Sequence, residues 1–245
     1  HDSTVAFGVG GRGLTPKQSS PENRSAIQSR QTKKLILLPR GCFKSSLITI
    51  GYSIWSLVRD PDLRILIDSE TQSNSKNFLH EIKEQMVRNE RLREFFPPMD
   101  AADESLWTKT EIIVRTRKKP RKEPSITATG VDITKTGMHY DKIIADDIVS
   151  QNNITTIEQR DKVIAHYKLL MALLEPGGEL ILVGTRWHDD DVYGYIITNE
   201  PGFERIIRKA VEGDKYLFPE RLTKEFLDDQ RRAMGSYLFS CQYQN

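Results

Sequence analysis

The sequence has few cysteines, no long apolar run and almost no net charge, and each of these absences excludes a class of protein. Only two cysteines, Cys42 and Cys241, occur among 245 residues, so the disulfide framework of small secreted domains is not expected. No apolar segment approaches the roughly 18 residues that a membrane-spanning helix needs. The formal net charge is +2, so any contact with nucleic acid must come from local clusters of charge. We therefore expect a soluble intracellular protein.

The strongest positive signal is a phosphate-binding loop. Four apolar residues, 35–38, end at a Pro-Arg-Gly turn, and Lys44 and Ser45 then open an apolar, helix-compatible run. The N-terminus of such a helix attracts phosphate, Lys44 can reach the β- and γ-phosphates, and the Ser45 hydroxyl can bind Mg²⁺. The standard pattern has glycine where Leu38 and Phe43 stand, so this segment alone leaves open an ordinary strand–turn–helix. The predicted ATP-binding residues are Pro39, Arg40, Gly41, Cys42, Phe43, Lys44, Ser45 and Ser46.

Two adjacent carboxylates follow a second apolar strand, predicted at 142–146. In P-loop ATPases the first acid of such a pair holds the Mg²⁺ shell and the next one polarises the attacking water. Asp146 fits the metal role and Asp147 the role of general base. The second acid of such a pair is usually glutamate, and aspartate is shorter by one methylene. The base must therefore sit nearer to the substrate or act through a positioned water.

A third strand, predicted at 179–184, ends at a hydroxyl residue, Thr185. At that position a hydroxyl could sense the γ-phosphate and relay hydrolysis to a moving part. Open α/β sheets bind ligands at the carboxyl ends of their strands. Three strands that all end in residues suited to phosphate chemistry therefore indicate one shared cleft.

Strands and helices alternate along the chain, which predicts an α/β fold with a mainly parallel sheet flanked by helices. We expect a flexible segment at 1–32, a P-loop ATPase core at 33–201 and a small linker subdomain at 202–245. The predicted helices are 45–58, 75–93, 156–174, 192–199 and 224–234, and the further predicted strands are 63–67, 111–115 and 125–129.

The order and spacing of the motifs resemble those of the ATPase domain of the large terminase subunit of tailed bacteriophages, a P-loop NTPase of the RecA-like (ASCE) class. The matching segments are Pro39-Arg40-Gly41-x-x-Lys44-Ser45-Ser46, residues 143–149 and Gly184-Thr185-Arg186-Trp187-His188. The resemblance implies an ATP- and Mg²⁺-dependent motor that drives double-stranded DNA into a prohead in the host cytoplasm. It further implies a portal and a small terminase subunit as partners, and a ring of copies when assembled. The closing segment, from Leu217, resembles the stretch before the family's nuclease domain, so we expect no nuclease activity and a monomeric isolated domain.

The resemblance also implies how charge on the γ-phosphate is neutralised. Arg40 is expected to contact it in cis. A neighbouring copy usually supplies a further cation about a dozen residues before the catalytic acid, where this chain has Lys135. Lysine lacks the planar fork of arginine, so Arg117 or another arginine is an alternative finger. The predicted catalytic residues are Asp147, Lys44, Arg40 and Thr185, and the predicted metal ligands are Ser45 and Asp146.

A dense run of basic residues follows the strand predicted at 111–115. Such a run can hold duplex phosphates without reading sequence, and its binding weakens with salt. A solvated turn is the alternative. The predicted DNA contacts are Arg115, Arg117, Lys118, Lys119, Arg121 and Lys122.

Two other classes of function remain open. A nucleotide-binding scaffold without turnover is favoured by Phe43 in the loop and by aspartate at 147. A helicase-like P-loop translocase would share the three strand-end motifs but needs a second RecA-like domain. Residues 189–191, three consecutive aspartates, are expected to cap the following helix and not to bind metal.

Overall fold

The core of the described part of the chain is a seven-stranded sheet in which all pairs of neighbouring strands but one run parallel. We describe residues 31–131 and 137–245 of a computed structural model. The strand order is β3-β4-β2-β5-β6-β1-β7, and only the edge strand β3 is antiparallel to its neighbour. The predicted α/β class with a mainly parallel sheet is confirmed. The strands are β1 (Thr32–Leu37), β2 (Ile65–Ser69), β3 (Glu111–Ile112), β4 (Ile126–Gly130), β5 (Tyr140–Asp146), β6 (Leu174–Gly184) and β7 (Glu204–Ile207).

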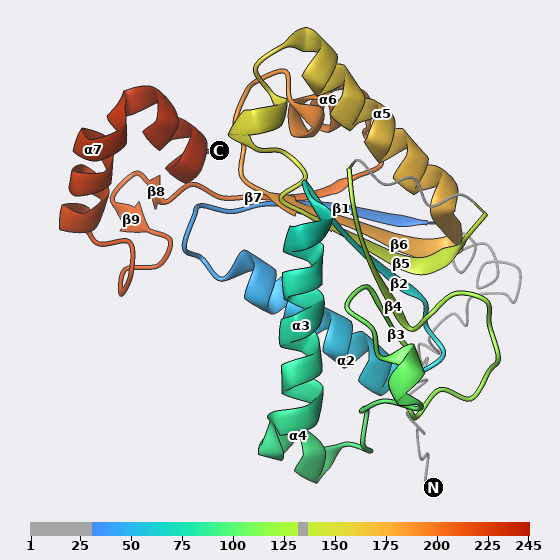
Figure 1. Cartoon of the computed structure of the whole chain (residues 1–245). Helices are drawn as coiled ribbons and strands as arrows, with labels where there is room; N and C mark the ends of the chain where they lie inside the picture. The colour runs from blue at the N-terminus through green and yellow to red at the C-terminus, as the bar shows by residue number, and fades with distance from the viewer. Residues whose placement is uncertain (1–30, 132–136) are drawn as a thin grey trace, which may run out of the picture.

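Helices cover both faces of this sheet (Figure 1). On one face lie α5 (Ile157–Leu173) and α6 (Val192–Asn199), and on the other lie α2 (Tyr52–Arg59) and α3 (Gln72–Arg88). A π-helical segment, η1 (Ser45–Gly51), leads into α2, and α3 is followed by the short α4 (Glu90–Phe95). Two 3₁₀ turns, η2 (Glu104–Leu106) and η3 (Gln151–Asn153), lie in loops.

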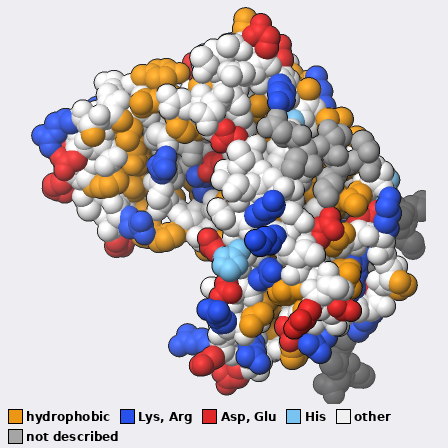
Figure 2. Space-filling model, in the orientation of Figure 1, with side chains coloured by type: hydrophobic (Ala, Val, Ile, Leu, Met, Phe, Trp, Pro, Cys, Tyr) orange, Lys and Arg blue, Asp and Glu red, His pale blue; other side chains and the backbone are white. Residues whose placement is uncertain are grey.

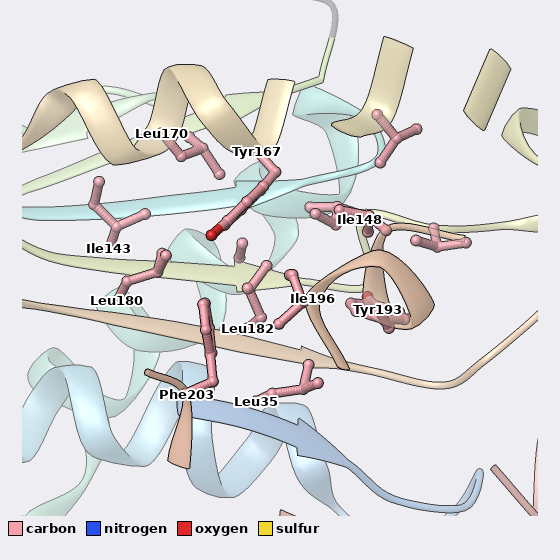
Figure 3. Packing of buried hydrophobic residues seen from close by; sticks show 14 of the residues in the cluster. Leu35, Ile143, Ile148, Tyr167, Leu170, Leu180, Leu182, Tyr193, Ile196 and Phe203 are labelled. Carbon is pink, nitrogen blue, oxygen red and sulfur yellow. The ribbon is translucent and has the colours of Figure 1, made fainter. Parts of the chain in front are cut away.

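Each face has its own apolar core because the buried strands carry apolar residues on both sides. In Figure 3, Tyr167 and Leu170 of α5 point onto Ile143, Leu180 and Leu182 of the sheet. The opposite core is built from η1, α2, α3 and the other side of β2, β4 and β5. Burial of one such large side chain contributes about 1.5–3 kcal/mol, so the two cores fix the strand ends from both sides.

Most of the predicted helices and strands are confirmed. The observed first and last residues of some helices differ from the predicted ones because capping residues set them. The helix predicted at 75–93 begins at Gln72, because the Thr71 side chain accepts the Asn74 N–H. It is also divided into α3 and α4, because Asn89 has an extended backbone (ψ 102°) and caps α4. The helix predicted at 224–234 is α7 (Lys224–Tyr243), which continues across a kink at Gly235 (φ +77°).

The C-terminal part packs on a small cluster of its own. The hairpin β8 (Val211–Glu212) and β9 (Lys215–Tyr216) lies with α7 to one side of the main sheet (Figure 1). The buried residues of this cluster include Leu222, between the hairpin and α7, and Leu227 and Phe239 of α7. The division of the chain at residue 202 stays a prediction, and β7, which follows it, pairs with β1 as part of the main sheet.

The predicted flexible segment, residues 1–32, lies outside the described residues except for Gln31 and Thr32, and Thr32 already begins β1. Among the helices of the described residues, none is long and apolar enough to cross a membrane.

Candidate nucleotide site

The phosphate loop leaves β1 at its carboxyl end and turns back into η1. Gly41 (φ +85°) and Phe43 (φ +54°) both adopt the left-handed conformation. A side chain in that conformation costs about 1–2 kcal/mol, and Phe43 stands where the standard pattern has glycine. Its ring lies 4.4 Å from the Arg221 guanidinium and 6.0 Å from the Phe218 ring. A cation–π contact of this kind contributes about 0.5–2 kcal/mol, so contacts with the C-terminal part offset the strain at Phe43.

Lys44 and the second predicted acid meet at the carboxyl edge of the sheet. Lys44 Nζ lies 3.1 Å from Asp147 Oδ2. The Asp147 backbone is left-handed (φ +48°), and its N–H donates to Val183 O at 2.8 Å. The carbonyl of Asp147 accepts the Glu70 N–H at 3.3 Å. The backbone is thus held from two sides while the side chain remains 41% exposed, which leaves the carboxylate accessible to a substrate or water.

Asp146, in contrast, is fully buried beneath the loop. The Thr49 hydroxyl donates to its Oδ2, and Ser45 is a further hydrogen-bond partner. Burial raises the pKa of Asp146 to about 6, the neighbouring Asp147 adds to this, and Thr49, Ser45 and Lys44 oppose it. Its Oδ1 has no hydrogen-bond partner among the described residues. A buried carboxylate oxygen without a partner, next to a serine hydroxyl, is the hard oxygen donor set that suits Mg²⁺.

Thr185 lies at the tip of β6, between the loop and the acids. It is 4% exposed, and its hydroxyl approaches Leu38 O at 3.5 Å. The preceding Gly184 is required by close approach, because an added Cβ would lie 2.1 Å from the Tyr193 hydroxyl oxygen. Tyr193, in α6, is fully buried and donates to Val183 O at 3.4 Å. This tip is therefore packed rigidly against α6.

Arg40 is turned toward the C-terminal part. Its N–H donates to Gln242 O at 2.9 Å, and its Nη1 approaches Gln242 Oε1 at 3.4 Å. A cavity of about 350 Å³ lies beside it, lined by Arg40, Gly41, Arg221, Leu222, Phe226 and Tyr243. Cys42 packs partly into the same C-terminal cluster, and burial raises the pKa of its thiol. One side of the phosphate loop is thus covered by the C-terminal part.

Sequence reasoning missed three residues of this site. Thr49 lies one helical turn after Ser45, and that spacing alone predicts a second hydroxyl on the same helix face. Glu70 and Tyr193 carry no local signal, because each reaches the site from a different strand or helix.

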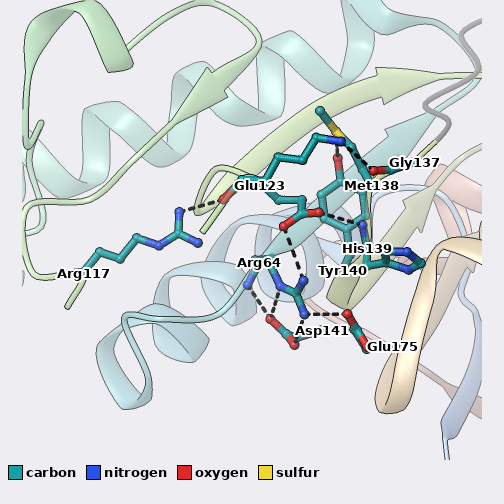
Figure 4. A network of polar contacts seen from close by, with 10 residues as sticks. Arg64, Arg117, Glu123, Gly137, Met138, His139, Tyr140, Asp141 and Glu175 are labelled. Carbon is teal, nitrogen blue, oxygen red and sulfur yellow. Dashed lines mark hydrogen bonds and ion pairs between the residues drawn. The ribbon is translucent and has the colours of Figure 1, made fainter. Parts of the chain in front are cut away.

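The predicted basic run lies elsewhere, at the amino ends of the strands. Arg115 pairs with Asp100 at 2.7 Å. Arg117 turns inward and donates to Glu123 O at 2.8 Å (Figure 4). Lys122 donates to Gly137 O at 2.8 Å. The structure does not bring this run to the nucleotide site, and its role in DNA contact stays a prediction. The predicted trans finger, Lys135, lies outside the described residues.

Of the aspartate run, Asp191 is confirmed as a helix cap, and it is buried while Asp189 and Asp190 are exposed. Asp191 is the N-cap of α6, and its Oδ1 accepts the Gly194 N–H at 2.9 Å.

Comparison with known proteins tests the resemblance to large terminase subunits independently of the motifs. No protein-family model matches the chain. Over 233 residues, or 90% of this chain and 38% of the relative, it is 27% identical to the terminase large subunit of Enterobacteria phage T3. The fold is similar to that of the HK97 bacteriophage large terminase, with a TM-score of 0.58 and 13% identity over 95% of this chain and 51% of that one.

A second solved structure is similar over nearly its whole length. It is a variant of the large terminase ATPase domain of Thermus phage P74-26, with a TM-score of 0.51 and 16% identity over 94% of this chain and 93% of that one. The chain spans well under half of the T3 protein and about half of the HK97 protein. The resemblance to the ATPase domain of tailed-phage large terminases, predicted from the motifs, is thereby confirmed in sequence and in fold.

Proposed function

We propose that this chain is the ATP-hydrolysing part of a DNA-packaging motor and uses Mg²⁺ to drive double-stranded DNA into a prohead. The observation that carries the proposal is the meeting of Lys44 with Asp147, and of Ser45 with Asp146, at one edge of the sheet. The named relatives are large terminase subunits or their ATPase domain, which supports the packaging role.

The chemistry we propose is transfer of the γ-phosphoryl group to water. Ser45 and Asp146 would hold Mg²⁺, which when bound would neutralise negative charge on the phosphates. Lys44, now paired with Asp147, exchanges this partner for the β- and γ-phosphate oxygens. The freed Asp147 carboxylate orients the attacking water and accepts its proton, as the bond between the γ-phosphorus and the bridging oxygen breaks. The products are ADP and inorganic phosphate.

Further parts of the proposal concern Arg40, Thr185 and a cation from a neighbouring copy. Arg40 would have to break its contact with Gln242 to reach the γ-phosphate in cis. Thr185 would contact the γ-phosphate and couple its loss to a movement of α6. A cation from a neighbouring copy, Lys135 or an arginine, completes the site in a ring and is worth about 10³ to 10⁵ in rate in related enzymes. Portal and small terminase subunit are the proposed partners in the host cytoplasm, and no nuclease activity is expected of this chain.

The test is steady-state ATP hydrolysis by the wild type and by Asp147→Asn, with and without duplex DNA and over a range of protein concentrations. Loss of the general base should lower the rate about 10²- to 10⁴-fold. Asp189→Asn is the matched control, because the Asp189 side chain is fully exposed. A rate per molecule that rises with concentration supports a finger in trans. Nucleotide binding without turnover under every condition would instead favour the scaffold alternative.

A further inference from the structure

A groove lined by cations and hydrogen-bond donors lies along α3, away from the nucleotide site. It encloses about 280 Å³ between α3 and the loop before β3. Its lining residues on the helix follow spacings of three and four, so they share one face. Among the described residues that line it, none is acidic; they are Ser73, Lys76, Asn77, His80, Lys83 and Lys109. Figure 2 shows lysine or arginine and histidine side chains gathered over α3 in the middle of this face.

Lys83 fixes the two walls of the groove relative to each other. Its Nζ approaches the carbonyl oxygens of Trp107 and Thr108 at 3.3 Å each, and it lies 5.4 Å from the Trp107 ring. Burial lowers the pKa of Lys83, and the nearby Glu84 opposes this. Glu84 itself pairs with Arg88 at 3.0 Å, so its charge is compensated outside the groove. The loop is thereby held against α3 with Lys109 at the groove.

The predicted basic run offers a less suitable surface for a polyanion. Arg115 is neutralised by Asp100, and the Arg117 side chain is turned inward. The backbone amides of Lys118 and Lys119 both bind Asp62 Oδ1 at 2.8 Å, which places a carboxylate within the run. An exposed carboxylate repels phosphate, whereas the described lining of the α3 groove has none.

The start of α3 is firmly attached to the sheet next to Asp147. Ser75 donates to Thr129 O, and a Cβ added at Gly130 would lie 2.4 Å from the Gln72 N atom. Glu70, two residues before α3, donates its N–H to Asp147 O at 3.3 Å. A ligand in the groove therefore binds a helix that is anchored to the end of β4 and is preceded by Glu70, which contacts the proposed general base.

We propose that the α3 groove binds the phosphate backbone of double-stranded DNA, through Lys76, Lys109 and their hydrogen-bonding neighbours. Apart from Lys83, which already contacts two backbone carbonyls, the lining side chains can donate hydrogen bonds or carry positive charge, which matches phosphate oxygens. The inference rests on the proposed function for its biological role, but the DNA contact can be tested without ATP.

The experiment is fluorescence anisotropy of a labelled duplex of mixed sequence, titrated with the full chain at salt concentrations from about 50 to 200 mM. Lys76→Glu/Lys109→Glu is compared with Lys118→Glu/Lys119→Glu, which makes the same change of charge in the basic run. The groove variant should lose roughly tenfold or more in affinity at the lowest salt. The slope of log affinity against log salt should fall by about 0.9 for each phosphate that the variant no longer binds. The matched variant should lose less than about threefold by the same counterion argument.

Lys76→Gln/Lys109→Gln, with thermal unfolding of every variant, separates weaker phosphate binding from misfolding, because glutamine removes charge without adding repulsion. It should also lower the affinity and the salt slope. Equal losses in the groove and basic-run variants, a larger loss in the basic run, or no DNA binding by the wild type would overturn the inference. A wild type that binds DNA through the groove but hydrolyses no ATP would overturn the proposed function alone.

Discussion

Charged residues lie at both ends of the parallel strands, which we call the amino edge and the carboxyl edge of the sheet, but they have different roles there. At the amino edge, where the parallel strands begin, Arg64 holds Asp141 through Nε at 2.9 Å and Nη2 at 2.8 Å, and also reaches Glu175 at 3.0 Å (Figure 4). Burial opposes ionisation of Asp141, but the hydrogen bonds from Arg64 outweigh it and lower its pKa. In this network the positive charge of Arg64 is compensated by the carboxylates around it.

The carboxyl edge, where the parallel strands end, is not satisfied in this way. Burial and Asp147 raise the pKa of Asp146 to about 6, and its Oδ1 has no partner among the described residues. Phe43 and Asp147 are both left-handed, although neither is glycine. Strain and unsatisfied charge of this kind concentrate at functional sites. The ion pairs of the amino edge stabilise the fold, whereas the carboxyl edge is where we propose that a ligand binds.

The largest expected effect is on stability, from loss of the Arg64 side chain's charge. Arg64→Met leaves Asp141 and Glu123 near the amino edge without their cation, and the Arg64 side chain is only 7% exposed. Removal of one partner of a buried ion pair costs about 3–5 kcal/mol. Urea unfolding measures the loss of unfolding free energy in Arg64→Met. Arg59→Met, at the exposed end of α2, is the control. A loss below about 1 kcal/mol would show that this edge is dispensable for the fold.

The next effect depends on pH. Burial alone would raise the pKa of Glu179, but bonds from Lys142, Lys34 and Tyr52 lower it from 4.5 to about 2. This stabilisation is fully present above about pH 4.5 and is lost as the pH falls through about 2. Glu179→Gln should therefore lower the unfolding free energy at pH 7 by about 3 kcal/mol, since each pKa unit is worth about 1.4 kcal/mol.

The measurement is chemical unfolding of Glu179→Gln and wild type at several pH values. The two should converge as the medium becomes more acidic. Glu94→Gln, on the exposed side of α4, is the control and should change little. A difference that does not depend on pH would mean that packing, and not the charge of Glu179, is responsible.

The smallest effect concerns the phosphate loop. Phe43→Ala keeps a side chain in the left-handed conformation and removes the contacts with Arg221 and Phe218, whereas Phe43→Gly removes the same contacts but relieves the strain. We expect the glycine variant to be more stable than the alanine variant by about 1 kcal/mol. Thermal unfolding of the pair decides this, and an alanine variant at least as stable as the glycine variant would show that the backbone at residue 43 is not strained.

Local patterns predicted the elements and the strand-end motifs because these depend on neighbouring residues. The apolar runs before Pro39 and Asp146 and the cap at Asp191 can be read from a few positions each. The left-handed backbone of Phe43 could not be predicted, because its stabilisation comes from Arg221, far along the chain.

Surface charge was harder to interpret than the fold. The basic run is dense in sequence, but the carboxylates of Asp62 and Asp100 contact it in the folded protein. The α3 groove was not predicted, because Lys109 is separated from Lys76 by more than thirty residues of sequence. Charge density along a chain does not show which cations remain unpaired after folding.

The most direct test of the incomplete carboxyl edge is the unfolding free energy of wild type and Asp146→Asn at pH 8, in EDTA and in Mg²⁺ with ATP. Because the pKa of Asp146 is raised, its protonated form stabilises the folded protein. This contribution is fully present below about pH 3.8 and is lost as the pH rises through about 6. In EDTA the variant should therefore be the more stable protein. With Mg²⁺ and ATP at about a thousand times the Kd the order should reverse, since that ligand concentration adds about 4 kcal/mol to the protein that binds it. This gain exceeds the roughly 3 kcal/mol that a pKa raised by about two units costs the wild type at pH 8. A variant that is less stable in EDTA, or that gains as much from Mg²⁺ and ATP as the wild type, would contradict the account.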